Sequence, residues 1–171
     1  MTITLLLAGC FNEKLPEVQQ GEFPFKLVYE YNGETEIIED TVFCEFYELT
    51  PYYIVPGKYR MWNRFLKSGD ERYHFTILKE ENKPSIFNKG RVNIDARVYI
   101  NYGAAEYYMG DPNSKSLTQS APSIEYIENY QKSENVQDCY TKVLSISDAE
   151  KYFGIQIKVW EFSKPIKNFF K

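Results

Sequence analysis

The sequence has little histidine and little cysteine: His74 is the only histidine, and there are three cysteines in 171 residues. This scarcity excludes most zinc sites, which draw their ligands from these two residue types. By strand alternation His74 lies beside Arg72 and Thr76 on a polar face, so we expect it to face solvent. The sequence also lacks a glycine-rich phosphate loop and a nucleophile elbow. It therefore predicts no catalytic residue, no metal site and no cofactor.

Other absences limit the partners and the chemistry. After residue 10 no stretch approaches the roughly 18 consecutive apolar residues of a membrane-spanning helix. The formal net charge of −4 argues against a broad basic surface, so we expect no nucleic-acid partner. Asp111-Pro112-Asn113-Ser114-Lys115 begins like a calcium loop, but Lys115 stands at the third ligand position and the closing glutamate is missing. A hydrolytic pair of carboxylates cannot be located from linear spacing.

Aromatic residues are in excess, at 17% of the chain with 15 Tyr and 12 Phe. Tyr and Phe favour strands. Alternation predicts strands at 26–31, 34–47, 72–79, 90–102 and 155–162, with 124–130 as a strand or a helix. Asn32-Gly33 predicts a tight hairpin turn, and Ser147 with Glu150 predicts the start of one helix that ends at Gly154. The predicted fold is all-β or β-rich, an antiparallel sandwich or meander with one short helix near the C-terminus.

The first ten residues carry the most specific signal. Met1 to Gly9 has no charge and ends in small residues directly before Cys10, which is typical of an exported signal segment. Leu7-Ala8-Gly9-Cys10 resembles the lipobox of bacterial lipoproteins. The resemblance implies that the Cys10 sulfur carries a diacylglyceryl group, that the chain is cut before Cys10, and that the acyl chains hold the protein on the outer face of the cell membrane.

This interpretation divides the chain into three parts. Residues 1–9 are a signal segment, residues 10–24 are the lipidated cysteine and a polar tether, and residues 25–171 are a single β-rich domain. As a flexible coil, the tether would span roughly 20 Å. Signal segments normally begin with Lys or Arg, and this one has neither. The alternative is a cytoplasmic protein whose first strand is apolar and in which Cys10 is a buried thiol.

Several other segments are similar to small uncharacterised lipoproteins of Gram-positive bacteria. The resemblance covers most of the chain but implies a location and no chemistry. Its segments are Phe23-Pro24-Phe25, the Tyr-Glu-Tyr-Asn-Gly turn, Gly57-Lys58-Tyr59-Arg60 and Ser163-Lys164-Pro165-Ile166-Lys167-Asn168.

With Cys10 lipidated, Cys44 and Cys139 remain as an even pair in an exported protein. One hypothesis is a disulfide between them. The other is two separate buried thiols, because Cys44 lies on the apolar face of a predicted strand.

Two aromatic segments form the candidate ligand-binding surface, and their Pro and Gly residues predict loops. Tyr and Trp on loops combine a large apolar area with a polar tip, which suits ligand and protein contacts. The alternative is that these rings fill the β core. The candidate residues are Tyr52, Tyr53, Tyr59 and Trp62 in segment 50–62, and Glu106, Tyr107, Tyr108 and Asp111 in segment 102–111.

The function favoured by these patterns is a membrane-anchored extracytoplasmic lipoprotein. We expect a non-enzymatic binding or accessory module that contacts a glycan, a peptide or an envelope protein. Two alternatives stay open, a structural partner in envelope assembly and a carboxylate-based envelope hydrolase.

Overall fold

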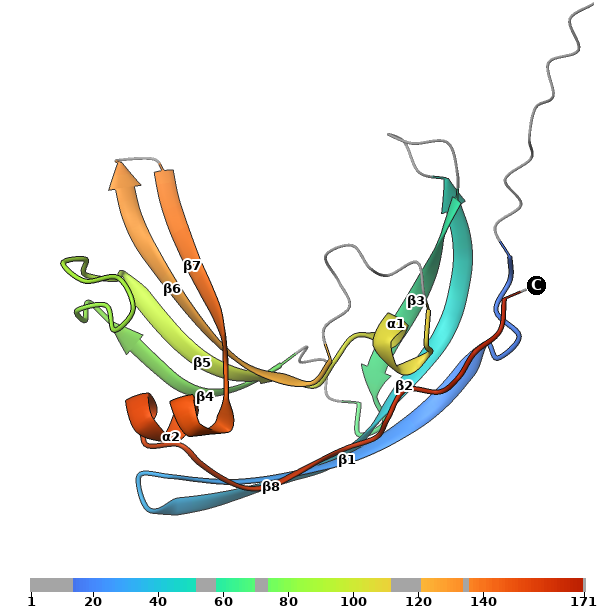
Figure 1. Ribbon diagram of the computed structural model, residues 1–171, viewed down its shortest axis with the longest axis horizontal. Coiled ribbons are helices and arrows are strands. Elements are labelled where there is room, and N and C mark those ends of the chain that lie inside the picture. Colours follow the sequence, from blue (N-terminus) through green and yellow to red (C-terminus); the bar gives the residue numbers. More distant parts are fainter. Residues whose placement is uncertain (1–13, 52–57, 70–73, 112–120, 134–135, 171) are drawn as a thin grey trace, which may run out of the picture.

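The structure, a computed structural model, describes residues 14–51, 58–69, 74–111, 121–133 and 136–170. Within them, two antiparallel four-stranded sheets confirm the predicted β-rich fold (Figure 1). The first sheet has the order β3-β2-β1-β8 and consists of β1 (Gln20–Tyr31), β2 (Glu34–Pro51), β3 (Lys58–Leu66) and β8 (Gln156–Phe162). The second has the order β4-β5-β6-β7 and consists of β4 (His74–Glu81), β5 (Asp95–Asn101), β6 (Ser123–Ser133) and β7 (Val136–Leu144).

The inward side chains of both sheets join into one hydrophobic cluster. Along β1 every second residue points inward, and Leu27 at its centre is fully buried. The Phe25 ring stacks on Phe162 of the same sheet, with ring centroids 5.0 Å apart, and lies 6.2 Å from Phe75 of the second sheet. Aromatic excess in the sequence therefore becomes the contact layer between the sheets.

The predicted hairpin turn is confirmed between β1 and β2. Asn32 and Gly33 both have positive φ values, 54° and 80°, which is the backbone that a tight two-residue turn requires. The register then pairs Tyr31 with Glu34 and continues to Gln20 opposite Glu45.

The predicted helix is present as α2 (Ile146–Phe153), with a different first residue from the one expected. Ser145, and not Ser147, caps it by accepting a hydrogen bond from the Asp148 backbone N–H. Gly154 ends the helix in the left-handed conformation, as predicted. No helix among the described residues is long and apolar enough to cross a membrane.

The expected loops at 50–62 and 102–111 are corrected by the structure. Strand β2 continues to Pro51 and β3 begins at Lys58, and the second segment contains the one-turn helix α1 (Ala105–Tyr108). The sequence hides β3 because its inward face alternates arginine with apolar residues. The inward residues are Arg60, Trp62, Arg64 and Leu66. Strand β7 was hidden for the same reason, since Asp138 and Lys142 share a face with Leu144.

The N-terminal part of the domain begins earlier than the expected boundary at residue 25. Strand β1 starts at Gln20, and Pro16 already forms a β-bridge with Phe170. Much of the expected tether, residues 10–24, is therefore part of the folded domain. Figure 1 shows the start of the described chain and the C-terminus side by side at one end of the molecule.

Candidate functional site

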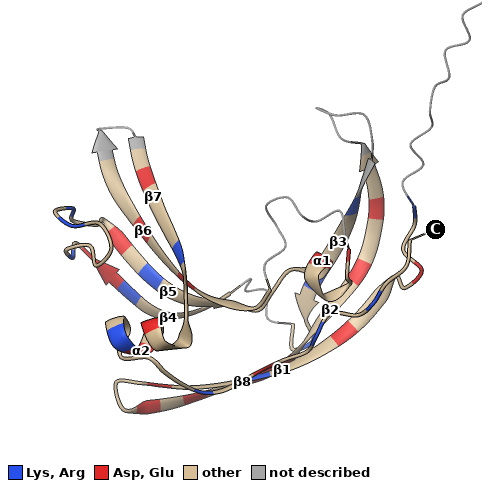
Figure 2. Ribbon diagram, viewed as in Figure 1, with Lys and Arg blue, Asp and Glu red and all other residues tan. Residues whose placement is uncertain are grey.

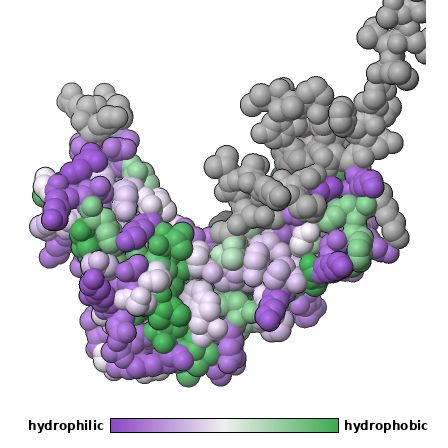
Figure 3. All heavy atoms as spheres, viewed as in Figure 1, coloured by the Kyte–Doolittle hydropathy of each residue, from purple (hydrophilic) through white to green (hydrophobic). Residues whose placement is uncertain are grey.

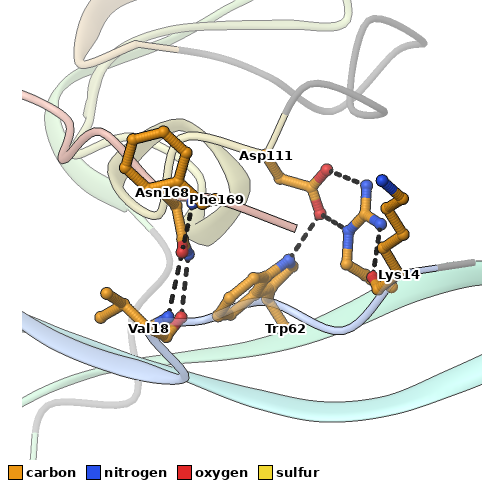
Figure 4. Close-up of polar contacts among 7 residues, drawn as sticks. Lys14, Val18, Trp62, Asp111, Asn168 and Phe169 are labelled. Atoms are coloured by element: carbon orange, nitrogen blue, oxygen red, sulfur yellow. Dashed lines mark hydrogen bonds and ion pairs between the residues drawn. The ribbon is translucent and has the colours of Figure 1, made fainter. Parts of the chain in front are cut away.

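Two residues of the predicted ligand-binding surface meet in a buried polar cluster. The Trp62 indole Nε1–H on β3 donates to Asp111 Oδ2, at 2.9 Å. The Arg60 guanidinium donates to both Asp111 oxygens, from Nε and Nη2, at 2.7 Å each (Figure 4). The Arg60 and Asp111 side chains are each 3% exposed. This bidentate pair binds the end of the α1 segment to β3.

The same cluster holds both terminal segments of the domain. Arg60 Nη1 donates to the Lys14 carbonyl oxygen at 3.0 Å, and the guanidinium lies 4.2 Å from the centre of the Phe170 ring. Asn168 and Val18 exchange two hydrogen bonds, at 3.0 and 2.8 Å (Figure 4). We call the four side chains that make these contacts the terminal clamp: Arg60, Trp62, Asp111 and Asn168.

The candidate binding residues therefore divide into two groups. Trp62, Tyr108 and Asp111 are 8%, 0% and 2% exposed, so they turn inward instead of lining an exposed surface. Tyr108 stacks on Phe23 with ring centroids 4.7 Å apart, and its hydroxyl donates to the Tyr102 carbonyl. Glu106 and Tyr107 are partly exposed. The remaining predicted residues lie outside the part of the chain that the structure describes. These are Tyr52, Tyr53 and Cys10 entirely, and Tyr59 except for its backbone pairing with Thr50.

Glu106 is the one carboxylate near the clamp with a raised pKa. Its partial burial raises the pKa most, and the negative charge of Asp111 raises it further. The Glu106 backbone N–H and the Arg64 charge act in the opposite direction and are outweighed. An ionised Glu106 is therefore destabilising in the folded state.

A second buried carboxylate, Glu128 on β6, was not found by sequence reasoning. It is fully buried and accepts hydrogen bonds from the Tyr126 and Tyr130 hydroxyls and from Ser85 Oγ, the last at 2.7 Å. Burial alone raises its pKa, but these donors outweigh burial and lower the pKa below its ordinary value. Glu128 is thus an ionised anchor for the β4–β5 connection. Only its alternation with Tyr126 and Tyr130 hinted at an inward position.

The two cysteines of the domain are free in the structure. Cys44 on β2 is fully buried, and burial raises the pKa of its thiol to about 12. Cys139 is exposed on β7 in the other sheet. Cys44 matches the buried-thiol alternative, and Cys139 does not.

His74 has the exposed position expected for it. It is the first residue of β4, and its ring centroid lies 4.6 Å from that of Tyr99 on the neighbouring strand. Tyr99 in turn donates to the Glu125 carboxylate at 2.8 Å. The histidine therefore belongs to the polar outer face of the second sheet.

Apolar side chains are exposed on the outer face of β2 and β3. The Phe43 and Phe65 rings lie 4.9 Å apart on paired residues, and by alternation Tyr47 and Met61 share this face. Phe65, Tyr47 and Met61 are 46%, 62% and 36% exposed. We call these four residues the outer patch. The hydrogen-bonded pair Asn63 and Glu45 lies between the two halves of the patch on the same face. Exposed apolar residues gathered on one face can mark an interaction surface.

An open pocket of about 630 Å³ lies where β1, β2 and β8 are adjacent. Lys26, Glu39, Asp40 and Glu161 contribute its charged lining. Lys26 forms an ion pair with Glu39, and these two side chains are 43% and 56% exposed. An exposed, paired carboxylate such as Glu39 is not in the desolvated environment that tunes a catalytic acid.

No protein-family model, curated protein or solved structure matches this chain. Within the residues that the structure describes, no group of three or more His, Cys, Asp or Glu side chains is arranged to hold a metal ion. Figure 2 shows acidic and basic residues interspersed over both sheets.

Replacing Asp111 with alanine should destabilise the domain by about 3–5 kcal/mol, because it leaves the buried Arg60 charge unpaired. Glu22→Ala is the matched control, since its ion pair with Lys67 is about half exposed and exposed pairs contribute about 0–1 kcal/mol. Urea unfolding followed by circular dichroism measures both. Equal effects of the two substitutions would show that the clamp has no special role in stability.

Replacing Glu106 with glutamine should raise the free energy of unfolding at pH 7. The folded-state pKa of Glu106 is above its unfolded value, so ionisation costs stability when the pH lies above both pKa values. Below the ordinary pKa of about 4.3 the gain should disappear. Unfolding curves from pH 3 to 8 test this, with the exposed Glu36→Gln as control. A gain that is independent of pH would contradict the assignment.

Proposed function

We propose that this protein is a lipid-anchored extracytoplasmic module whose domain is held close to the membrane. One observation carries the proposal: the chain is already bound to the domain at Lys14, through its carbonyl oxygen and Arg60. Lys14 is four residues after Cys10, the cysteine of the lipobox-like sequence. A cysteine that starts the mature chain so near a fixed, surface-exposed point is well placed for a lipid anchor.

The short connection limits the height of the domain above the lipid. Four residues span at most about 14 Å, at roughly 3.3–3.6 Å per residue. This is shorter than the roughly 20 Å of the flexible tether expected from sequence, because β1 and the bridge at Pro16 take up most of that segment. In this proposal the domain therefore lies near the lipid headgroups, because the connection to the anchor is short.

We further propose that the module binds an envelope protein through the outer patch. The backbone N–H of Phe46, beside Tyr47, donates to the Gln19 carbonyl at 2.7 Å, so one end of the patch lies next to the N-terminal segment. A partner on this surface would be met close to the membrane. This favours an envelope protein over the glycan or the free peptide that the sequence also allowed.

Two buried carboxylates, Asp111 and Glu128, do not suit the hydrolase alternative. Asp111 is engaged by Arg60 and Trp62, and Glu128 is engaged by two tyrosines and Ser85. A general acid or base needs an open path to substrate, and these two side chains are buried at 2% and 0% exposure. Their hydrogen bonds organise the domain.

Acyl attachment is tested in the native host by metabolic labelling with an alkyne fatty acid. We expect the wild-type protein to take up label and Cys10→Ser to take up none, because the thioether requires the Cys10 sulfur. Cys139→Ser is the matched control, since Cys139 is an exposed thiol, and it should be labelled like the wild type. Label that persists in Cys10→Ser would refute the lipid anchor.

The partner surface is tested by site-specific photocrosslinking in intact cells. A photoreactive residue at Phe65 or Tyr47 should give a discrete protein adduct, because both side chains are exposed in the outer patch. The same probe at Val143, which is 64% exposed on the other sheet, should not give that adduct. The same adducts from all three positions would argue against a defined surface.

A further inference from the structure

The two terminal segments together form a surface of a distinct composition. Residues 14–18 and 168–170 run side by side, joined by the Pro16–Phe170 bridge and by the hydrogen bond from the Glu17 backbone N–H to the Phe169 carbonyl. Pro16 is buried and Phe170 lies on Arg60, whereas Leu15, Glu17, Val18 and Phe169 of the same two segments are exposed.

Three of these exposed side chains are apolar. Leu15, Val18 and Phe169 are 47%, 40% and 55% exposed. Figure 3 shows hydrophobic atoms at the surface, among hydrophilic ones, at the end of the molecule where the termini lie. Three exposed apolar side chains in two short paired segments lose the favourable free energy that burial of their surface would provide.

Basic residues also lie exposed on these segments. Lys14 and Lys167 are exposed on the same two segments, and the Lys167 ammonium lies 5.4 Å from the centre of the Phe169 ring. Lys164 is also exposed, four residues before Asn168. Glu17 is the acidic residue of this surface. The local charge is thus positive on a chain whose net charge is −4.

We infer that this surface faces and contacts the lipid headgroups, and we call it the terminal surface: Lys14, Leu15, Val18, Lys167 and Phe169. The inference rests on the proposed function, because the anchor at Cys10 brings the surface to the membrane. Exposed apolar side chains with lysines on the same segments are a composition with which proteins lie at the headgroup boundary of an anionic bilayer.

The anchor length selects lipid as the occupant. Leu15 is five residues from Cys10, so its backbone lies within about 18 Å of the acylated sulfur however the connection is arranged. A soluble partner or a second copy of the chain would have to displace the bilayer from this position. The positive local charge also matches an anionic leaflet, whereas the remainder of the chain is net acidic.

The test uses the complete acylated protein in vesicles of phosphatidylethanolamine and phosphatidylglycerol that carry a nitroxide on the headgroup. An environment-sensitive fluorophore is attached at Phe169→Cys in a Cys139→Ser chain, or at the native Cys139 as the distant control. Cys44 is fully buried and does not react. We expect about half of the fluorescence at position 169 to be quenched and almost none at Cys139, since residues at the headgroup boundary lie about 5–10 Å deep.

A charge-reversed pair adds a second readout. Lys14→Glu with Lys167→Glu should reduce the quenching at position 169 by about twofold or more in anionic vesicles. Lys83→Glu with Lys89→Glu changes the net charge equally on the exposed β4–β5 connection and should not reduce it.

The outcomes separate the two proposals. Intact mass measured before reconstitution reports acylation, so an unacylated native protein refutes the anchor and the inference that rests on it. An acylated protein with equal quenching at the two positions, or with none at position 169, overturns the terminal surface alone. Equal loss of quenching from both lysine pairs also overturns it, because the effect would then come from net charge.

Discussion

The buried ion pair between Arg60 and Asp111 is the interaction on which the arrangement of the domain depends. It lies where four segments far apart in the sequence meet: the segment at Lys14, strand β3, the end of the α1 segment and the segment at Phe170. Removing two charges from water is costly, and apolar residues of equal volume often stabilise a fold at least as much as a buried ion pair does. The pair contributes a specific geometry, because the two hydrogen bonds from a guanidinium to a carboxylate form in one planar orientation. That orientation holds Lys14 and Phe170 against the same guanidinium.

The sequence predicted the parts of the fold that follow from local chemistry. Asn32-Gly33 requires a tight turn, Gly154 ends a helix, and the inward residues of β1 alternate without interruption. It failed where burial was polar. Arginines on the inner face of β3 broke the apolar alternation, and their buried partner, Asp111, is 51 residues from Arg60. Linear spacing carries no information about such a pairing, so Trp62 and Asp111 were candidates for an exposed surface, and a core position for the aromatic rings was the open alternative that Trp62 matches.

Aromatic residues have two separate uses in this molecule, and burial distinguishes them. Inward rings such as Phe25 and Tyr108 join the two sheets and support α1. This packing uses much of the high aromatic content of the chain. Among the described residues, the exposed aromatic side chains include Tyr47 and Phe65 on the outer face of β2 and β3, Tyr152 on α2 and Phe169 near Pro16. A sequence pattern does not separate the two uses, because Tyr and Trp suit a core and a contact surface equally.

The outer patch and the terminal surface adjoin, and this limits how the module works. Gln19 follows Val18 of the terminal surface and accepts the hydrogen bond from Phe46, which precedes Tyr47 of the outer patch. If the terminal surface lies on the lipid, the outer patch extends away from the membrane along β2 and β3, with its Tyr47 end lowest. In the proposed arrangement, a partner bound at the Tyr47 end would lie near the membrane. The clamp sets the angle between the two surfaces, so a substitution at Asp111 that left the domain folded would disturb partner binding and lipid contact together, whereas Phe65→Ala would disturb the first alone.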